Sequence, residues 1–393
     1  MTKYNFTERI DRSNSGAKKW DLMYEQNPNV SQNIMPMSVA DMEFDTAPEI
    51  KAGLKDYIDE SIFGYVEPTD SFYEAVINWQ AKRHNWDVKD DWILTTPGVV
   101  VAINLAVQTY TKPGDGVITF TPVYGPFTQA AENNNRKLVN VPLIEVNNHY
   151  TIDFDKFEQA AKETKNKLLL LCSPHNPIGR VWTSEEIETL AQIIEENNLR
   201  VFSDELWNDL VLGDNQHTVL ANVNDYMKNH TITAHAASKT FNLAGMHAST
   251  LIIPNTDLRT QFQVAIEEAH LSVNMLGYKA TELAYNQGEE WLAQLIKVVE
   301  ENQQLSHNFF KENLPEIIAP VSEATYVQWL DFRKLDLSKE DLSNLLINEA
   351  ELFLNDGTSF GEEGEGFARM NLAVPTEVLK ESLERLYQAV KNR

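Results

Sequence analysis

Residues 167–180 read KLLLLCSPHNPIGR, and this stretch decides how the rest of the chain is interpreted. After Lys167, residues 168–172 form a short apolar run without polar alternation, which is typical of a strand buried on both faces of a parallel sheet. The next eight residues contain Asn-Pro and Gly, which are turn formers. The stretch therefore predicts a buried strand that ends in a polar turn at the edge of a sheet.

Comparable runs recur on both sides of this strand, from about residue 46 to about residue 285. The strand candidates are 117–120, 137–143, 167–172, 200–203, 230–235 and 249–253. Amphipathic stretches lie between them at 72–84, 153–164 and 184–197. Thr183 and Glu186 have capping-box spacing and predict that the last of these helices begins just after a turn. The alternation predicts an α/β domain with a mostly parallel sheet.

The pattern changes to long helical runs from about residue 289. Helices are expected at 289–313, 338–349 and 377–391, around strand candidates at 324–330 and 367–372. We expect a large α/β domain over 46–288 and a smaller α+β domain formed by 1–45 and 289–393.

The charge of the chain excludes some classes of partner. Among 393 residues there are 58 acidic and 33 basic ones, which gives a formal net charge of −25. Nucleic acid and anionic membranes require a basic surface, so we expect neither as a partner. The only cysteine, Cys172, lies in an apolar run and predicts a buried thiol in a reducing compartment. No signal peptide or transmembrane stretch is visible, and the cytoplasm is the expected location.

Several common catalytic motifs are absent from the sequence. It contains no Walker A loop, no G-x-G-x-x-G, no H-E-x-x-H, no G-x-S-x-G and no paired C-x-x-C, and no metal site is expected. The glycine-rich segment 361–366, GEEGEG, carries three glutamates that would repel a phosphate, so we interpret it as an acidic loop.

Five other segments have functional interpretations, although each also has an ordinary structural one. Segment 173–180 could be only a turn, the carboxylates of 203–205 could cap a helix, and the lysine of 238–241 could be a solvated surface residue. Segment 96–100 precedes an apolar helix, whose free N–H groups could hold an anion. Segment 367–371 places Arg369 in an otherwise apolar strand, where the charge needs an anionic partner. The segments are TPGVV, SPHNPIGR, SDE, SKTF and FARMN.

Taken together, the five segments resemble the aminotransferase-like, fold type I, pyridoxal-phosphate enzymes. The spacings are 28 residues from Asn176 to Asp204, 35 from Asp204 to Lys239 and 130 from Lys239 to Arg369. Within that superfamily the chain is most similar to the MalY/PatB-type cystathionine β-lyases and C–S lyases. The stretches that carry this similarity are ADMEF (40–44), TAP (46–48), FGY (63–65), TPVY (121–124), NPIGRVW (176–182) and SKTFN (238–242).

The resemblance implies pyridoxal 5′-phosphate as cofactor and assigns residues around its ring. Lys239 matches the lysine that bonds covalently to the cofactor and, once displaced by the substrate amine, takes the proton from the substrate Cα. Asp204 matches the carboxylate beside the pyridine nitrogen. Asn176 matches the hydrogen-bond donor to the ring oxygen, and Tyr124 matches the aromatic residue that stacks on the ring. Lys239, Asp204 and Tyr124 are the expected catalytic residues.

The phosphate of the cofactor is expected at backbone N–H groups of Val99 and Val100, with Ser238 nearby. Two positions differ from the family pattern. Ala236 stands where a phosphate-binding hydroxyl is common, and His247 stands where classical aminotransferases place an arginine. We expect His247 to contribute to a weaker phosphate site.

The resemblance also implies a substrate site and a homodimer. Arg369 matches the fork that binds the substrate α-carboxylate, with Asn176 and Ala40 beside it. Trp207 replaces a family tyrosine near the ring oxygen and can donate only through its indole N–H. Tyr65 matches a tyrosine that reaches the cofactor phosphate of a partner subunit, and 272–274 falls where a partner loop approaches it.

The resemblance therefore predicts a C–S β-lyase that converts L-cystathionine or a related cysteine thioether to a thiol, pyruvate and ammonia. Two alternatives stay open. The same site could support an aminotransferase of broad specificity, although no second arginine for an acidic side chain is apparent. The second alternative is a MalY-like protein with an additional regulatory binding role.

Overall fold

A computed structural model describes residues 4–393, so residues 1–3 of the expected small domain lie outside the described part. The helices are α1 (Lys18–Gln26), α2 (Pro48–Glu60), α3 (Asp70–His84), α4 (Val99–Tyr110), α5 (Pro126–Asn133), α6 (Phe154–Lys162), α7 (Ser184–Glu196), α8 (Asp225–His230), α9 (Ala237–Thr240), α10 (Thr256–Glu268), α11 (Met275–Gln287), α12 (Glu289–Asn313), α13 (Lys339–Asn344) and α14 (Thr376–Lys391). The strands are β1 (Ile93–Thr96), β2 (Gly116–Thr121), β3 (Lys137–Pro142), β4 (Ile144–Val146), β5 (His149–Thr151), β6 (Asn166–Cys172), β7 (Arg200–Asp204), β8 (Thr231–His235), β9 (Ser249–Ile252), β10 (Val327–Asp331), β11 (Asn355–Asp356) and β12 (Phe367–Asn371).

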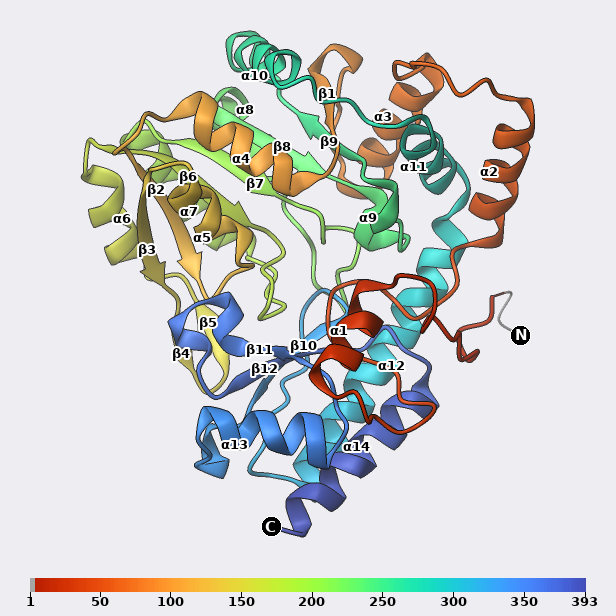
Figure 1. The fold of residues 1–393 in the computed structure, drawn as a ribbon. Coiled ribbons are helices and arrows are strands. Elements are labelled where there is room, and N and C mark those ends of the chain that lie inside the picture. The colour runs from red at the N-terminus through yellow and green to blue at the C-terminus, as the bar shows by residue number, and fades with distance from the viewer. Residues whose placement is uncertain (1–3) are drawn as a thin grey trace.

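A seven-stranded sheet forms the upper half of the molecule in Figure 1, in the order β1-β9-β8-β7-β6-β2-β3. Strands β3, β2, β6, β7 and β8 pair in parallel, whereas β9 runs antiparallel to both of its neighbours. The expected mostly parallel sheet is therefore confirmed.

The apolar run of β6 is continuous because both of its faces are covered. Leu168 and Leu170 pack in a core with residues of α4, α5 and α10. Leu169 and Leu171 point to the opposite face and pack in a core with residues of α6 and α7. Successive side chains of a strand alternate between faces, so a strand between two helical layers needs apolar residues at every position.

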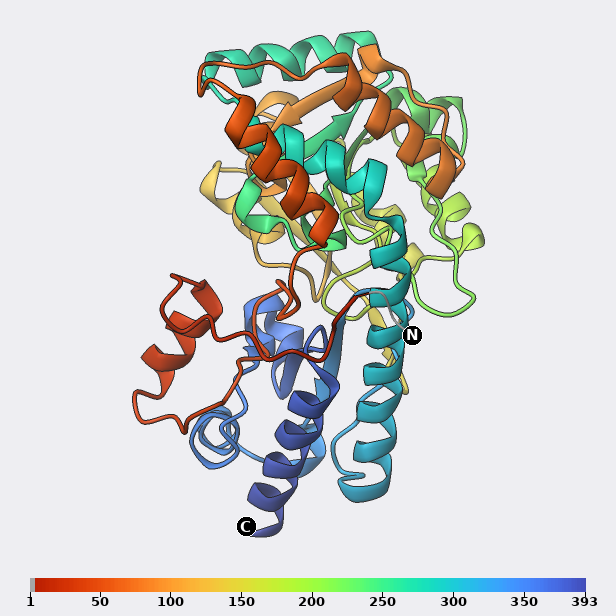
Figure 2. The ribbon, with the colours of Figure 1, turned by 90° about the vertical axis from the view of Figure 1, so that its right-hand side faces the viewer.

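The lower half contains a three-stranded antiparallel sheet, in the order β10-β12-β11, with α12, α13 and α14 around it (Figure 1). The N-terminal segment joins this part of the chain: Trp20, Met23 and Met37 share a core with residues of β12 and α14. Figure 2 shows α1 beside these C-terminal elements. This packing supports a small domain built from both chain ends, and its boundaries at 45 and 289 stay a prediction.

The expected elements are found with small shifts, and four details differ. His230 ends α8 instead of beginning a strand, and the expected helix over 338–349 divides into α13 and a π-helical turn at Leu345–Glu349. The edge strands β1 and β11 were not expected. The expected strand over 137–143 continues into a hairpin of β4 and β5, whose two turn residues, Asn147 and Asn148, both have positive φ. The capping box of Thr183 and Glu186 is present at the start of α7.

Among the described residues, no helix combines the length and the apolar character that crossing a lipid bilayer requires.

Candidate active site

The polar turns expected from the sequence meet at the carboxyl ends of β6, β7 and β8. Asn176 follows β6, Asp204 is the last residue of β7, and Lys239 lies in α9, directly after β8. These three strands are adjacent and parallel, and this edge of such a sheet is where α/β proteins commonly bind ligands.

Asp204 is a buried carboxylate whose negative charge is stabilised by few neighbouring groups. Its Oδ1 accepts a hydrogen bond from the backbone N–H of Leu206 at 3.2 Å, and no ion pair to it is formed within residues 4–393. Desolvation is the main cause that raises its pKa to about 7, although the Leu206 N–H and the charge of Lys239 act in the other direction. A cation placed against this group would restore its ionisation.

Lys239 is the base candidate of the site. Its Nζ donates a hydrogen bond of 2.6 Å to the carbonyl oxygen of Ala40 and lies 5.6 Å from the centre of the Trp207 ring. Desolvation, followed by the positive charge of Arg369, lowers the pKa of Lys239 to about 8. A far larger fraction of this amine than of an ordinary lysine amine is therefore unprotonated near neutral pH, which favours a nucleophilic role.

The guanidinium of Arg369 lies in the same region, and only some of its N–H groups have hydrogen-bond partners. Its Nη1 donates to Asn176 Oδ1 at 2.9 Å and its Nη2 donates to Asn355 Oδ1 at 2.8 Å, while the buried Nε has no hydrogen-bond partner. Desolvation lowers the pKa of Arg369 to about 10. The guanidinium also stands 4.8 Å from the ring centre of Phe360. The anionic partner expected for Arg369 is not a side chain among the described residues, so an anionic ligand suits this site.

Residues 39–44 form a backbone strap between Lys239 and Arg369. Val39 has a φ of +54°, which is rare for a β-branched residue and indicates strain. Its N–H donates to Asn355 Oδ1 at 2.8 Å, and the side chain of Asn371 donates to its carbonyl at 2.8 Å. The Ala40 carbonyl accepts from the hydroxyl of Tyr326 at 2.9 Å as well as from Lys239. The strap thereby places the Ala40 carbonyl within hydrogen-bond distance of Lys239 Nζ.

Asn355 and Tyr326 are site residues that the sequence did not reveal. Asn355 lies on the two-residue strand β11, and Tyr326 precedes β10. Neither occurs in a recognisable motif, because a single asparagine or tyrosine in a short loop has no spacing signature. Tyr326 also contacts Trp207 edge to face, with ring centres 4.8 Å apart, so the Trp207 indole is held against the lysine.

Three further expected residues are Tyr124, Val99 and Val100. Tyr124 is 37% exposed, and its pKa is raised by desolvation and influenced by the charges of Arg369 and Asp204, which places it in the site. Val99 and Val100 begin α4, directly after Gly98 at φ +103°.

Three others make no side-chain hydrogen bond within residues 4–393. Ser238 is half-buried in α9, beside Lys239. His247 is exposed at a turn, and Tyr65 is fully exposed between α2 and α3. The structure therefore does not bring His247 or Tyr65 into contact with the other candidates.

The glycine-rich segment 361–366 is the expected loop, except for a 3-10 turn at Glu362–Gly364, and it has a structural role in addition. Glu363 accepts hydrogen bonds from Thr121 at 2.9 Å and Asn140 at 3.1 Å. The N–H of Val123 donates to the carbonyl of Phe360 at 2.8 Å. These hydrogen bonds hold residues 360–363 against the segment that leads to Tyr124.

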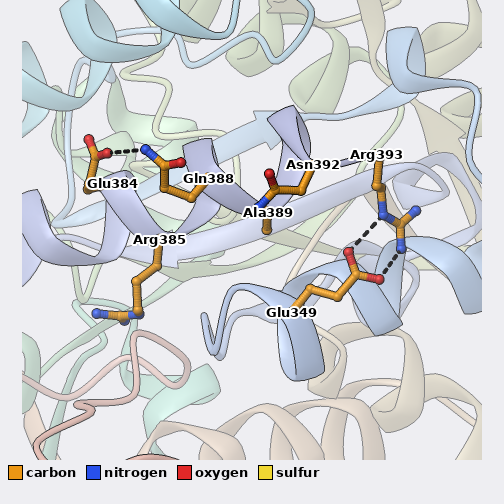
Figure 3. Close-up of a pocket in the computed structure, with 7 residues that line it drawn as sticks. All are labelled: Glu349, Glu384, Arg385, Gln388, Ala389, Asn392 and Arg393. Atoms are coloured by element: carbon orange, nitrogen blue, oxygen red, sulfur yellow. Dashed lines mark hydrogen bonds and ion pairs between the residues drawn. The ribbon is translucent and has the colours of Figure 1, made fainter.

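A separate pocket of about 400 Å³ lies at the end of α14 and is shown in Figure 3. Its charged groups are already paired: Arg393 binds Glu349, and Arg385 donates to the carbonyls of Ala350 and Glu351. Its second carboxylate, Glu384, accepts a hydrogen bond from Gln388 at 2.7 Å. In the part of the chain that is described, no group of three His, Cys, Asp or Glu side chains could hold a metal ion.

Comparison with known proteins identifies the family. The model of the aminotransferase class I and II family matches residues 32–386. The chain belongs to this family. Its fold is the fold type I arrangement expected from the sequence, with Asn176, Asp204 and Lys239 at the carboxyl edge of the large sheet.

Three members or structural relatives illustrate the similarity. Cystathionine β-lyase PatB of Bacillus subtilis is 36% identical over 98% of this chain and 100% of its own length. The crystal structure of cystalysin from Treponema denticola, which contains a pyridoxal 5′-phosphate cofactor, is 46% identical, covers 99% of both chains and superposes with a TM-score of 0.98. The pyridoxal-phosphate-bound C–S lyase of Staphylococcus hominis is 30% identical over 98% of both chains, with a TM-score of 0.91.

Proposed function

We propose that this chain is a pyridoxal-phosphate-dependent C–S β-lyase that cleaves L-cystathionine or a related cysteine thioether to a thiol, pyruvate and ammonia. The observation that carries the proposal is that Lys239 lies close enough to Asp204, at the carboxyl edge of the large sheet, and to Arg369, on β12 of the small sheet, for both charges to act on its amine. They do so in a chain that aligns over nearly its whole length with cystathionine β-lyase PatB.

The residues fit the cofactor in their chemistry. Asp204 is a buried carboxylate whose ionisation lacks a cation, and the protonated pyridine nitrogen of the cofactor would supply one. Lys239 offers an amine that desolvation has made nucleophilic, as covalent attachment to the cofactor requires. Tyr124 has an accessible ring beside Asp204 that can cover one face of the cofactor.

The phosphate is assigned to the start of α4. Gly98 precedes this twelve-residue helix, and the first N–H groups of Val99 and Val100 have no acceptor within the helix. Backbone N–H groups at a helix start bind phosphate without a cationic side chain, which suits a chain of net charge −25. Ser238 lies next to Lys239 and is the hydroxyl assigned to the same phosphate.

When bound, pyridoxal phosphate supplies an electron sink for the charge that a departing proton leaves on the substrate Cα. Lys239 is the base that accepts this proton, because its amine is partly unprotonated near pH 7 and the Ala40 carbonyl orients it. The Cβ–S bond then breaks, the sulfur leaves as a thiolate, and hydrolysis of the remaining three-carbon unit gives pyruvate and ammonia.

Arg369 orients the substrate for this proton transfer. Its free Nε–H, next to an Nη that is held by Asn176 or Asn355, can bind the α-carboxylate with two parallel hydrogen bonds. Fixing the carboxylate and the amine determines where the Cα–H bond points, which is the positional contribution that an enzyme makes to such a step.

We assign the working form to a homodimer with shared active sites. Ile62, Phe63 and Tyr65 form an apolar surface patch, and Ile62 and Phe63 are 92% and 70% exposed in the single chain. Patches of this kind are typical of protein interfaces. In this arrangement Tyr65 serves the phosphate of the partner subunit, and 272–274 approaches the same phosphate. The buried, unpaired thiol of Cys172 suits a reducing compartment such as the cytoplasm.

The deciding experiment is to incubate the cofactor-loaded protein with L-cystathionine in the absence of a keto acid. We expect pyruvate, ammonia and free thiol in equal amounts. Product that forms only after a keto-acid acceptor is added would contradict the lyase and would instead support the aminotransferase.

A further inference from the structure

A buried polar cluster lies beside the candidate active site and is not used by the mechanism above. Its centre is Asp209, which is 3% exposed. The Asp209 carboxylate accepts hydrogen bonds from Trp79 Nε1 at 3.0 and 3.1 Å and from Thr240 Oγ1 at 3.1 Å. His84 Nε2 lies 3.0 Å from Oδ1, and Arg83 Nε lies 3.6 Å from the same oxygen.

The charge state of Asp209 follows from these partners. Desolvation opposes its ionisation, but the hydrogen bond and charge of His84 and the charge of Arg83 leave the pKa of Asp209 below its usual value. The group is therefore a carboxylate that can only accept hydrogen bonds, and the Thr240 hydroxyl must be the donor.

The Thr240 hydrogen bond joins two segments of the candidate active site. Asp209 lies five residues after Asp204, on the same segment as Trp207, and Thr240 directly follows Lys239. Helix α9 has only four residues, and Ala236 before it offers no side-chain cap. Such a short helix has little stability of its own, so its position depends on contacts of this kind.

We propose that Asp209 is a positioning residue that, through Thr240, fixes the segment carrying Lys239 against the segment carrying Asp204 and Trp207. The inference rests on the proposed function, since it concerns the base of that reaction. Asp209 itself does not touch the reacting atoms. Its effect arises because a base displaced by a fraction of an ångström transfers a proton more slowly.

Substitutions at Thr240 test the link without disturbing the rest of the cluster. Thr240→Val keeps the shape of the side chain and removes only the hydroxyl, while Trp79 and His84 continue to bind Asp209. Thr240→Ser keeps the hydroxyl. The matched control is Ser203→Ala, because Ser203 is another fully buried hydroxyl that donates to a carboxylate of the same segment, Glu205 Oε1 at 2.9 Å, and it has no bond to α9.

The first measurement uses the cofactor-loaded enzyme. For Thr240→Val we expect kcat for L-cystathionine to fall about 10- to 100-fold with little change in KM. Thr240→Ser should retain most of the wild-type kcat. Ser203→Ala should lower the melting temperature without lowering kcat. In combination with Asp209→Ala, which removes the acceptor of the Thr240 hydroxyl, Thr240→Val should lower kcat little further, because both changes remove the same link.

The second measurement does not depend on turnover. The cofactor-free protein is labelled with a trace of acetic anhydride at several pH values, and the acetylation of Lys239 is compared with that of surface lysines by peptide mass spectrometry. We expect an altered rate or pH profile at Lys239 in Thr240→Val and a wild-type profile in Thr240→Ser and Ser203→Ala.

Wild-type labelling and wild-type kcat in Thr240→Val would overturn the proposal, as would equal effects on kcat in Thr240→Val and Ser203→Ala. If the wild-type enzyme proves to be an aminotransferase, the labelling result still decides the role of Asp209, so the two failures are distinguishable.

Discussion

Lys239 is a lysine whose amine has a single hydrogen-bond acceptor within residues 4–393, the carbonyl of Ala40. No carboxylate forms an ion pair with it in that part of the chain, and desolvation lowers its pKa to about 8. A surface lysine would instead stay protonated. The environment therefore prepares this amine for covalent chemistry.

Replacing Lys239 by alanine should remove covalent cofactor attachment and nearly all turnover. The physical reason is that, among residues 4–393, Lys239 is the lysine whose charge acts on Asp204. The measurement is borohydride reduction of the loaded protein followed by peptide mapping. Cofactor that is still fixed to the Lys239→Ala chain, in the same peptide or another, would show that the lysine is wrongly assigned.

Asp204 should make the stability of the cofactor-free protein depend on pH. Its folded pKa of about 7 lies above the ordinary value of 3.8, so the folded state binds more protons than the unfolded state between these values. Stability from this group should therefore fall as pH rises from about 4 to about 7, by at most a few kcal/mol.

The comparison that isolates Asp204 is Asp204→Asn, which does not titrate there. Its melting temperature relative to the wild type should rise with pH over that window and then level off, measured without cofactor. With cofactor bound, the wild type should have the higher melting temperature, because its carboxylate then faces a cation. If the difference in melting temperature between the two proteins stays constant from pH 4 to 8, Asp204 is not a carboxylate without a cationic partner.

Among the secondary-structure elements, the turn after β6 is joined to the lower part of the molecule by Arg180. Its guanidinium binds both oxygens of Glu186, at 2.9 and 2.8 Å, and Glu323 Oε2 at 2.5 Å. Its Nε donates to the carbonyl of Tyr150 in β5 at 2.8 Å. One side chain thus connects the start of α7, the hairpin and the segment before β10.

Removing this connection should destabilise the protein strongly. Arg180→Ala leaves two partly buried carboxylates without their partner, and we expect the free energy of unfolding to fall by about 3 kcal/mol. Lys162→Ala is the control, because Lys162 forms an exposed ion pair with Glu158 and should change stability by about 0.5 kcal/mol or less. Urea unfolding measures both. Equal losses in the two variants would mean that Arg180 does not connect the elements energetically.

At the scale of the whole molecule, the shared site can be tested with two inactive variants. Tyr65→Ala and Lys239→Ala homodimers should each be defective. A mixed dimer has one site that combines the intact lysine of one chain with the intact tyrosine of the other. Unfolding and refolding the two proteins together should therefore restore activity, up to one working site per mixed dimer.

The control is to demonstrate that mixed dimers form, for example with chains that carry different affinity tags. If they form without recovered activity, and Tyr65→Ala alone is clearly impaired, then Tyr65 and Lys239 serve the same site from one chain.

The class of fold and the residues with a local signature could be predicted from the amino-acid sequence. An apolar run such as 168–171 is recognisable because burial on both faces leaves no polar position. Lys239 and Asp204 follow such runs, and Arg369 is an unpaired charge within one, so each stands out locally.

The distant polar residues that complete the site could not be predicted in this way and are apparent only from the folded chain. Asn355, Tyr326 and Asp209 act through partners 14 or more residues away: Asn355 binds Arg369, Tyr326 binds Ala40, and Asp209 binds Thr240. Their roles arise from long-range hydrogen bonds, which leave no periodicity or spacing in the chain. The strain at Val39 has the same origin, because contacts from Asn355 and Asn371 hold that backbone in a conformation that its own sequence disfavours.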